Sequence, residues 1–247
     1  MKTIRLIAVL ISLMFSTAFS QIVSGSISGT MPGYITGYLN DRNGCVPTSI
    51  AEVLAYWDLQ YSMLNMFPGV SGTNLYTVSN VTNEISQIAS DCGTDGTGDT
   101  LTTNICPGLV TYAGSMGYAF QATLSGNILP PGVKTHGSQI SLAAAWNNLV
   151  NSINANEPML LLVAPDTSGT PSHVTPVFAY SNTSGTDYYE YIADDGIPTW
   201  AQFQALDNSP YSVLNEIQIN SVPEPSTWAM LIGGATSLLL FRRRRRS

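Results

Sequence analysis

Cysteine and histidine give this chain of 247 residues its clearest candidates for nucleophilic chemistry, and it has three of the first and two of the second. Cys92 and Cys106 flank a loop rich in Gly, Thr and Asp. A bridge between them would stabilise the fold by about 3 kcal/mol, because it restricts the unfolded chain. We therefore predict a disulfide here, with two buried free thiols as the alternative. Cys45 is left unpaired, which in an oxidising compartment indicates either burial or reactivity.

Cys45 lies where a helix is expected to begin. Pro47 suits a first helical turn, and the pattern predicts a helix from about Cys45 to Asp58. Its apolar positions are Ile50, Val53, Leu54 and Trp57. A thiol at this end faces the positive pole of the helix dipole, which lowers its pKa, and Arg42 acts in the same direction if it points inward. We therefore expect a reactive Cys45, with a buried structural cysteine as the alternative.

His173 and His136 are the two possible partners of this thiol. His173 begins a predicted strand, and residues 182–185 are expected to form a four-residue turn into the next one. If that turn closes the hairpin, His173 lies directly opposite Asp194, whose carboxylate could then orient the imidazole. A slip of one residue would place Asp195 there instead. His136 has no acidic neighbour and is expected to be a solvated loop residue.

The elements that carry these residues follow from apolar periodicity. Three further helices are predicted, around 81–88, 107–117 and 142–153. Runs rich in β-branched and aromatic residues then predict strands at 158–164, 174–180, 187–194 and 213–219. Because helices come first and strands second, we expect an α+β fold, with an N-terminal helical part followed by a C-terminal antiparallel sheet.

Composition limits the partners of the central region. Between residues 21 and 222 there are two basic side chains, Arg42 and Lys134, and fifteen acidic ones, a formal charge of −13. Such a surface argues against a nucleic-acid partner. The length and the 44% hydrophobic content suit one domain over residues 21–222.

An acidic loop in this region invites a metal interpretation. Asp91, Asp95 and Asp99 could bind calcium weakly, but their spacing lacks the later glutamate of an EF-hand. A solvated acidic loop is the preferred interpretation, so we predict no metal and no other cofactor.

The first twenty residues carry an export signal. Lys2 and Arg5 precede an apolar stretch over residues 6–15, and small residues follow at 18 and 20. This pattern is typical of a secretory signal peptide over residues 1–20, which signal peptidase would remove. A permanent membrane helix is the weaker alternative because the apolar run is short.

The last 25 residues combine Pro-Glu-Pro at 223–225, an apolar segment over residues 228–241 and five arginines at 242–246. An apolar block closed by arginines inserts with the charges on the cytoplasmic side, so it forms a transmembrane segment that leaves the preceding domain outside. Residues 223–247 resemble the PEP-CTERM sorting tail of Gram-negative bacteria. That resemblance implies recognition and removal by exosortase, a transient anchor in the inner membrane, and delivery to the cell envelope, the outer surface or the extracellular matrix. A simple tail anchor is the alternative.

The segments Gly-Cys-Val-Pro-Thr-Ser at 44–49 and Tyr-Trp-Asp at 56–58 resemble the nucleophile region of C39-like peptidases in bacterial surface proteins. The resemblance continues through 94–95, 108–109, 146, 158–162, 172–174, 180 and 191–194, so it covers most of residues 38–195. It implies a papain-like fold in which Cys45 is the nucleophile, His173 the general base and acid, and Asp194 the residue that orients His173.

One position departs from this family. Papain-like enzymes use a glutamine upstream of the cysteine as an oxyanion donor, and the corresponding residue here is Leu39. Asn40 and Asn43 are candidates to donate instead, alongside the amide of Cys45. The resulting prediction is an exported cysteine peptidase that hydrolyses a protein or peptide substrate through a thioester. A non-enzymatic matrix or adhesion protein with the same fold, and an acyltransferase or transglutaminase-like enzyme, are the alternatives.

Overall fold

The computed structural model describes residues 23–36, 44–128, 139–164, 173–204 and 212–220. The predicted signal peptide and the predicted sorting tail lie outside these ranges. So do Arg42, Lys134 and His136.

All four expected helices are present. They are α2 (Cys45–Gln60), α3 (Thr82–Asp91), α4 (Thr102–Ser115) and α5 (Leu142–Asn154), with short 3₁₀ turns at Gly72–Tyr76 and Val78–Asn80. The start of α4 was expected near Pro107, but the helix begins at Thr102. The start of α5 follows a common rule, since the Ser141 side chain accepts a hydrogen bond from the Ala144 amide at 3.1 Å and caps the helix.

One antiparallel sheet contains most of the strands, in the order β2-β9-β5-β6-β7-β8, with β1 paired to β6. The strands are β1 (Val23–Ser26), β2 (Gln121–Leu124), β5 (Met159–Ala164), β6 (His173–Thr183), β7 (Thr186–Ile192), β8 (Pro198–Gln202) and β9 (Ser212–Asn220). A separate parallel pair joins β3 (Asn127–Ile128) to β4 (Gln139–Ile140). Since β1 and β2 come from the N-terminal half of the chain, the expectation of a purely C-terminal sheet is corrected.

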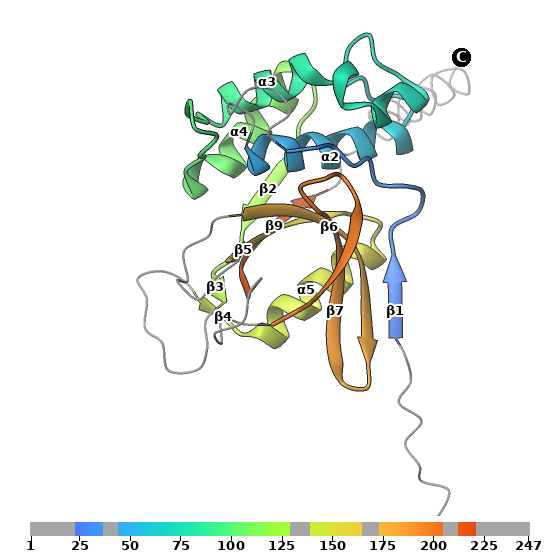
Figure 1. Ribbon diagram of the computed structural model, residues 1–247, viewed down its shortest axis with the longest axis vertical. Coiled ribbons are helices and arrows are strands. Elements are labelled where there is room, and N and C mark those ends of the chain that lie inside the picture. Colours follow the sequence, from blue (N-terminus) through green and yellow to red (C-terminus); the bar gives the residue numbers. More distant parts are fainter. Residues whose placement is uncertain (1–22, 37–43, 129–138, 165–172, 205–211, 221–247) are drawn as a thin grey trace, which may run out of the picture.

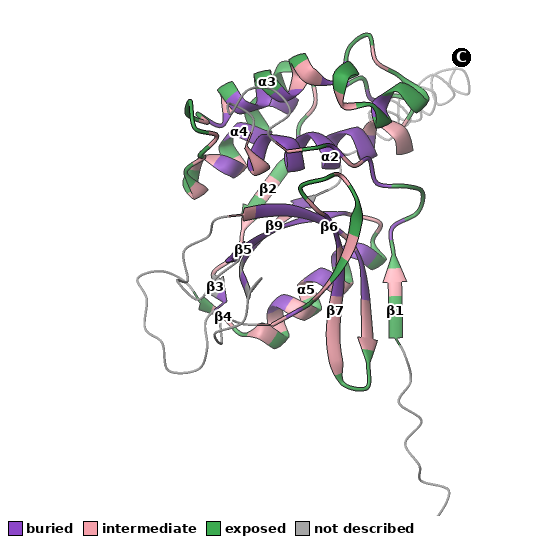
Figure 2. Ribbon diagram, viewed as in Figure 1, coloured by how far each residue is buried: buried purple, intermediate pink, exposed green. Residues whose placement is uncertain are grey.

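Helices cover both faces of this sheet. Figure 1 shows α2, α3 and α4 together on one side and α5 on the other. Every residue of β5 is buried, as expected for a central strand with both faces covered. The purple segments of Figure 2 follow α2 and the central strands, where the core lies. The core therefore lies where α2 packs against the sheet.

The β6–β7 hairpin has a different turn from the one expected. The strands pair as far as Thr183 and Thr186, so only Ser184 and Gly185 form the loop. Both have positive φ, 56° and 83°, as two-residue hairpin loops with the favoured twist require. The predicted four-residue turn over 182–185 is therefore wrong.

The register of this hairpin also changes along its length. A bulge between Val177 and Ala179 shifts the pairing, and β7 ends at Ile192. His173 consequently has no direct strand partner in β7. The expected pairing of His173 with Asp194 is not formed, and Asp194 lies in the turn after β7, where the Gly196 amide donates to the Ala193 carbonyl.

Candidate active site

The N-terminus of α2 is shaped by a glycine. Gly44 has extended backbone angles and caps the helix, so Cys45 is the first helical residue. A Cβ atom on Gly44 would lie 1.9 Å from the carbonyl oxygen of Gly98. Only glycine therefore allows the loop around Gly98 to pack against this end of the helix, beside Cys45.

Two hydrogen bonds attach this end of α2 to the start of β6. The amide of Val174 donates to Cys45 Sγ at 3.3 Å, and Ser49 Oγ donates to the Val174 carbonyl at 2.9 Å. Cys45 and Ser49 are four residues apart and share one face of the helix. The peptide groups of Val174 are thus held at both ends, which fixes its neighbour His173 close to the thiol.

The surroundings of Cys45 act on its pKa in opposite directions. Burial raises it, and the carboxylate of Asp194 raises it further. Hydrogen bonds from the amides of Val174, Cys45 and Val46 lower it. The net pKa is raised, so the expectation of a lowered value is wrong: loss of water outweighs the donors at the helix end. The resting sulfur is a thiol at neutral pH.

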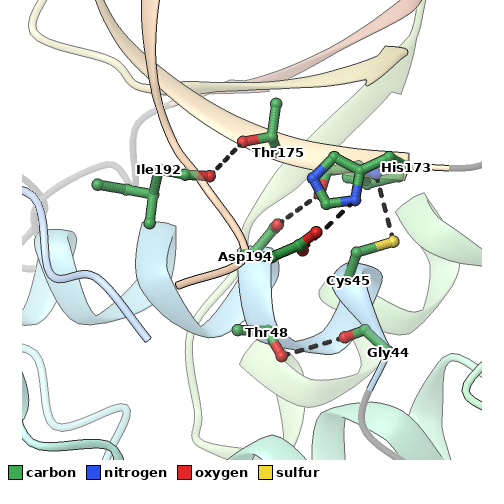
Figure 3. Close-up of polar contacts among 9 residues, drawn as sticks. Gly44, Cys45, Thr48, His173, Thr175, Ile192 and Asp194 are labelled. Carbon is green, nitrogen blue, oxygen red and sulfur yellow. Dashed lines mark hydrogen bonds and ion pairs between the residues drawn. The ribbon is translucent and has the colours of Figure 1, made fainter. Parts of the chain in front are cut away.

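His173 and Asp194 meet at the same place. Figure 3 shows the side chains of Cys45, His173 and Asp194 converging from α2, from the start of β6 and from the turn after β7. His173 Nδ1 lies 3.7 Å from Asp194 Oδ1, and the two side chains are 15% and 68% exposed. Burial lowers the pKa of His173, while Asp194 raises it. The imidazole is therefore neutral at pH 7 and can accept a proton.

The structure separates the two candidate aspartates. Asp195 Oδ1 accepts a hydrogen bond from the Ile197 amide at 3.1 Å and closes the turn. Asp194 is the one that approaches His173. Thr175 Oγ1 donates to the Ile192 carbonyl at 2.7 Å, which ties β6 to the end of β7 just before this turn.

Two adjoining cavities open at His173. One of about 80 Å³ lies beside Cys45 and His173 and is bounded by Gly98 and Asp99. The other, of about 260 Å³, lies on the side of Asp194. Since His173 lines both cavities, an extended molecule that occupied them would pass the imidazole, and its part in the smaller cavity would lie beside the sulfur.

The loop that bounds the smaller cavity is held by its own acidic residue. Asp95 Oδ1 accepts hydrogen bonds from the amides of Thr97 and Asp99 at 2.8 and 3.0 Å. Bonds from Thr97 lower the pKa of Asp95. Within the described ranges, no group of three or more Asp, Glu, His or Cys side chains could hold a metal ion.

Ser49 and Thr175 were not foreseen as parts of this site. The available signal was spacing: Ser49 lies one helical turn after Cys45, and Thr175 lies two residues after His173 on the same strand face. The oxyanion candidates Asn40 and Asn43, together with Leu39, fall outside the described residues.

The predicted disulfide is not formed. Cys92 and Cys106 are both free thiols, as is Cys45. A Cβ atom on Gly108 would lie 2.3 Å from Cys92 Sγ, so this sulfur packs directly onto α4. The sulfur of Cys106 accepts a hydrogen bond from the Leu124 amide instead. The two thiols therefore have different neighbours, and the correction follows from packing that the loop composition does not reveal.

Comparison with known families identifies one segment. Residues 221–246 match the PEP-CTERM protein-sorting motif. This match confirms the predicted tail: the chain is exported, associated with the cell envelope, and sorted and processed by exosortase. No curated protein matches the chain.

Within the described residues, no helix is both long enough and apolar enough to cross a bilayer.

Proposed function

We propose that residues 21–222 form a papain-like cysteine peptidase domain of the C39-like kind, displayed outside the cell and acting on proteins or peptides. The observation that supports this most strongly is the shared cavity. Cys45 Sγ is held 3.3 Å from the Val174 amide, and the adjacent His173 lines the same cavity with Asp194 beside it. Thiol catalysis uses a nucleophile beside a base, with a third group such as a carboxylate that orients the base.

The first half of the reaction uses the neutral pair. A peptide carbonyl carbon next to Cys45 is attacked by sulfur while the His173 imidazole takes the thiol proton. The low pKa of His173 keeps this base free, which matters because the raised pKa of Cys45 leaves little thiolate at rest. Negative charge develops on the carbonyl oxygen near the N-terminus of α2, whose dipole stabilises it.

The second half regenerates the thiol. Collapse of the tetrahedral intermediate breaks the C–N bond, and the imidazolium gives its proton to the leaving amine. Water then attacks the Cys45 thioester, with His173 taking a proton from the water and returning it to sulfur. Asp194 stabilises the imidazolium in both steps, since its carboxylate favours the charged form of His173.

Peptide cleavage tests this proposal. The exported protein is incubated with a complex mixture of peptides, and new termini are identified by mass spectrometry. We expect cleavage with the wild type and none with Cys45→Ala. Identical, uncleaved mixtures for both proteins would overturn the peptidase proposal.

A structural role is the second candidate, favoured by one specific observation. The 3.7 Å between His173 Nδ1 and Asp194 Oδ1 exceeds a hydrogen bond, and Asp194 is largely solvated. A domain that retains the fold without turnover, serving as an adhesion or matrix module, would tolerate such a loose contact. It would leave Cys45 no more reactive than an ordinary buried thiol.

A further inference from the structure

Glu52 is a buried carboxyl group for which the proposed reaction has no step. It is 2% exposed and lies on α2, two turns beyond Cys45 and on the same side of the helix. Burial holds the pKa of Glu52 well above its usual range, and the nearby carboxylate of Asp194 acts in the same direction. Both effects favour the protonated form of the carboxyl group, and the second arises because Glu52 lies near a member of the site.

The partner of Glu52 is a segment that we call the strap, residues 31–36. Glu52 Oε1 accepts a hydrogen bond from the Tyr34 amide at 2.6 Å. The Tyr34 ring is buried, and its hydroxyl donates to the Leu75 carbonyl. Tyr34, in the middle of the strap, is thus attached to α2 through its amide and to the 3₁₀ turn that contains Leu75 through its hydroxyl.

The strap in turn holds the turn that carries Asp194. The amide of Thr36 donates to the Asp194 carbonyl at 2.9 Å. On the other side of Tyr34, a Cβ atom on Gly33 would lie 2.1 Å from the Gly196 carbonyl oxygen. The strap therefore contacts the turn at Asp194 and again at Gly196, with Glu52 anchoring the residue between these contacts.

We propose that Glu52 is a positioning residue, which acts through the strap to fix Asp194 beside His173. This inference rests on the proposed function, because the place of Asp194 matters only if His173 acts as a base. Because Glu52 and Cys45 lie on the same helix, the hydrogen bond from Tyr34 to Glu52 fixes the place of the strap, and with it Asp194, relative to Cys45.

A purely structural role for Glu52 gives a different expectation. Removal of the carboxyl group would then lower the thermal unfolding midpoint but leave the chemistry of Cys45 in the folded fraction unchanged. Positioning predicts a change in the pH dependence as well. Asp194 raises the pKa of His173, so a displaced Asp194 moves the acid limb of Cys45 reactivity to lower pH.

The experiment measures alkylation of Cys45 in the folded exported protein by iodoacetamide, as a function of pH. For Glu52→Leu we expect a rate about ten- to a hundredfold lower at neutral pH, because small displacements of catalytic groups have effects of this size. Glu52→Gln has nearly the same size and keeps an oxygen that can accept from the Tyr34 amide, so it should stay within a few-fold of the wild type.

A second variant tests the strap without removing a polar group. Gly33→Ala must push the strap away from Gly196, so it should slow alkylation and shift the acid limb in the same direction as Glu52→Leu. Gly114→Ala is the matched control, since nothing lies within 4 Å of a Cβ atom there. This keeps the test decisive if Glu52→Leu does not fold.

Double variants test whether Glu52 and Gly33 act through Asp194. In a protein that already carries Asp194→Ala, neither Glu52→Leu nor Gly33→Ala should reduce the rate further. Additive losses, or an acid limb that does not move, would overturn the positioning role while the proposed function stands. A wild-type Cys45 that reacts no faster than a small thiol would instead contradict the proposed function itself.

Discussion

Cys45, which is half-buried, and Cys92, which is buried, are two thiols at opposite kinds of helix end. Cys45 begins α2, and Cys92 caps the C-terminus of α3. Burial raises the pKa of both. For Cys45, three backbone amides act against this effect, whereas for Cys92 the neighbouring Asp91 and Cys106 reinforce it and bring the pKa to about 12.

The difference shows what separates a usable thiol from an inert one in this fold. Desolvation alone makes sulfur unreactive, as at Cys92, which is 0% exposed and packed against α4. Cys45 has donors, a cavity and a neutral imidazole beside it. In the proposed reaction, its reactivity depends on the base next to it and not on a low resting pKa.

The largest expected effect is the contrast between these two thiols. In the folded protein at pH 8, alkylation of Cys45 should exceed that of Cys92 by about a thousandfold or more, because a thiol of pKa about 12 has almost no thiolate at that pH. Peptide mass spectrometry after timed quenching measures both rates. Denaturation in urea should remove the contrast, and similar rates in the native protein would contradict it.

The pH dependence of Cys45 sharpens the contrast. In the proposed reaction the neutral form of His173 is the base. Burial lowers the pKa of His173, so this form should persist to more acidic pH than in a solvated histidine. The acid limb of the alkylation rate should therefore have its midpoint below about pH 6.5. Rates measured from pH 4 to 9 decide this, and a midpoint above 7 would show that the charged imidazole is the resting form.

The bond from Ser49 to the Val174 carbonyl should have a smaller effect. Ser49→Ala frees one end of the segment that carries His173, and we expect Cys45 alkylation to fall about fivefold. Ser152, a buried serine on α5, provides the matched control as Ser152→Ala. Equal rates for both variants would mean that Val174 is held well enough by its amide alone.

The smallest effect concerns the thiols that do not form a bridge. Cys106→Ala should lower the free energy of unfolding by less than about 1 kcal/mol, since a half-buried thiol is lost and no cross-link is removed. A loss near 3 kcal/mol would be the signature of a disulfide. Titration of the denatured, unreduced protein should find three thiols, and one thiol would restore the bridge.

The helices and central strands could be predicted from the sequence because their apolar residues recur with clear periods. Cys45 falls at the start of α2 as expected, and the long buried strand β5 falls within one residue of its predicted range. The short strands β1, β2 and β8 were missed. Each has only four or five residues, and none of these residues is buried, so no apolar face marks the strand in the sequence.

The contacts within the site were harder to predict than the residues. The loop of the β6–β7 hairpin and its bulge both change the register, and neither leaves a mark in composition. Asp194 approaches His173 from a turn held by the strap and not by strand pairing. Glu52 was not singled out from the sequence, because its partner Tyr34 lies in a segment without a periodic pattern.

The central claim is that His173 activates Cys45. Its most direct test is the second-order rate of iodoacetamide with Cys45 in the wild type, in His173→Ala and in a small free thiol at the same pH. We expect the wild type to react faster than the small thiol and His173→Ala to slow the reaction by about a hundredfold or more. A wild-type rate below that of the small thiol and unchanged by His173→Ala would contradict it.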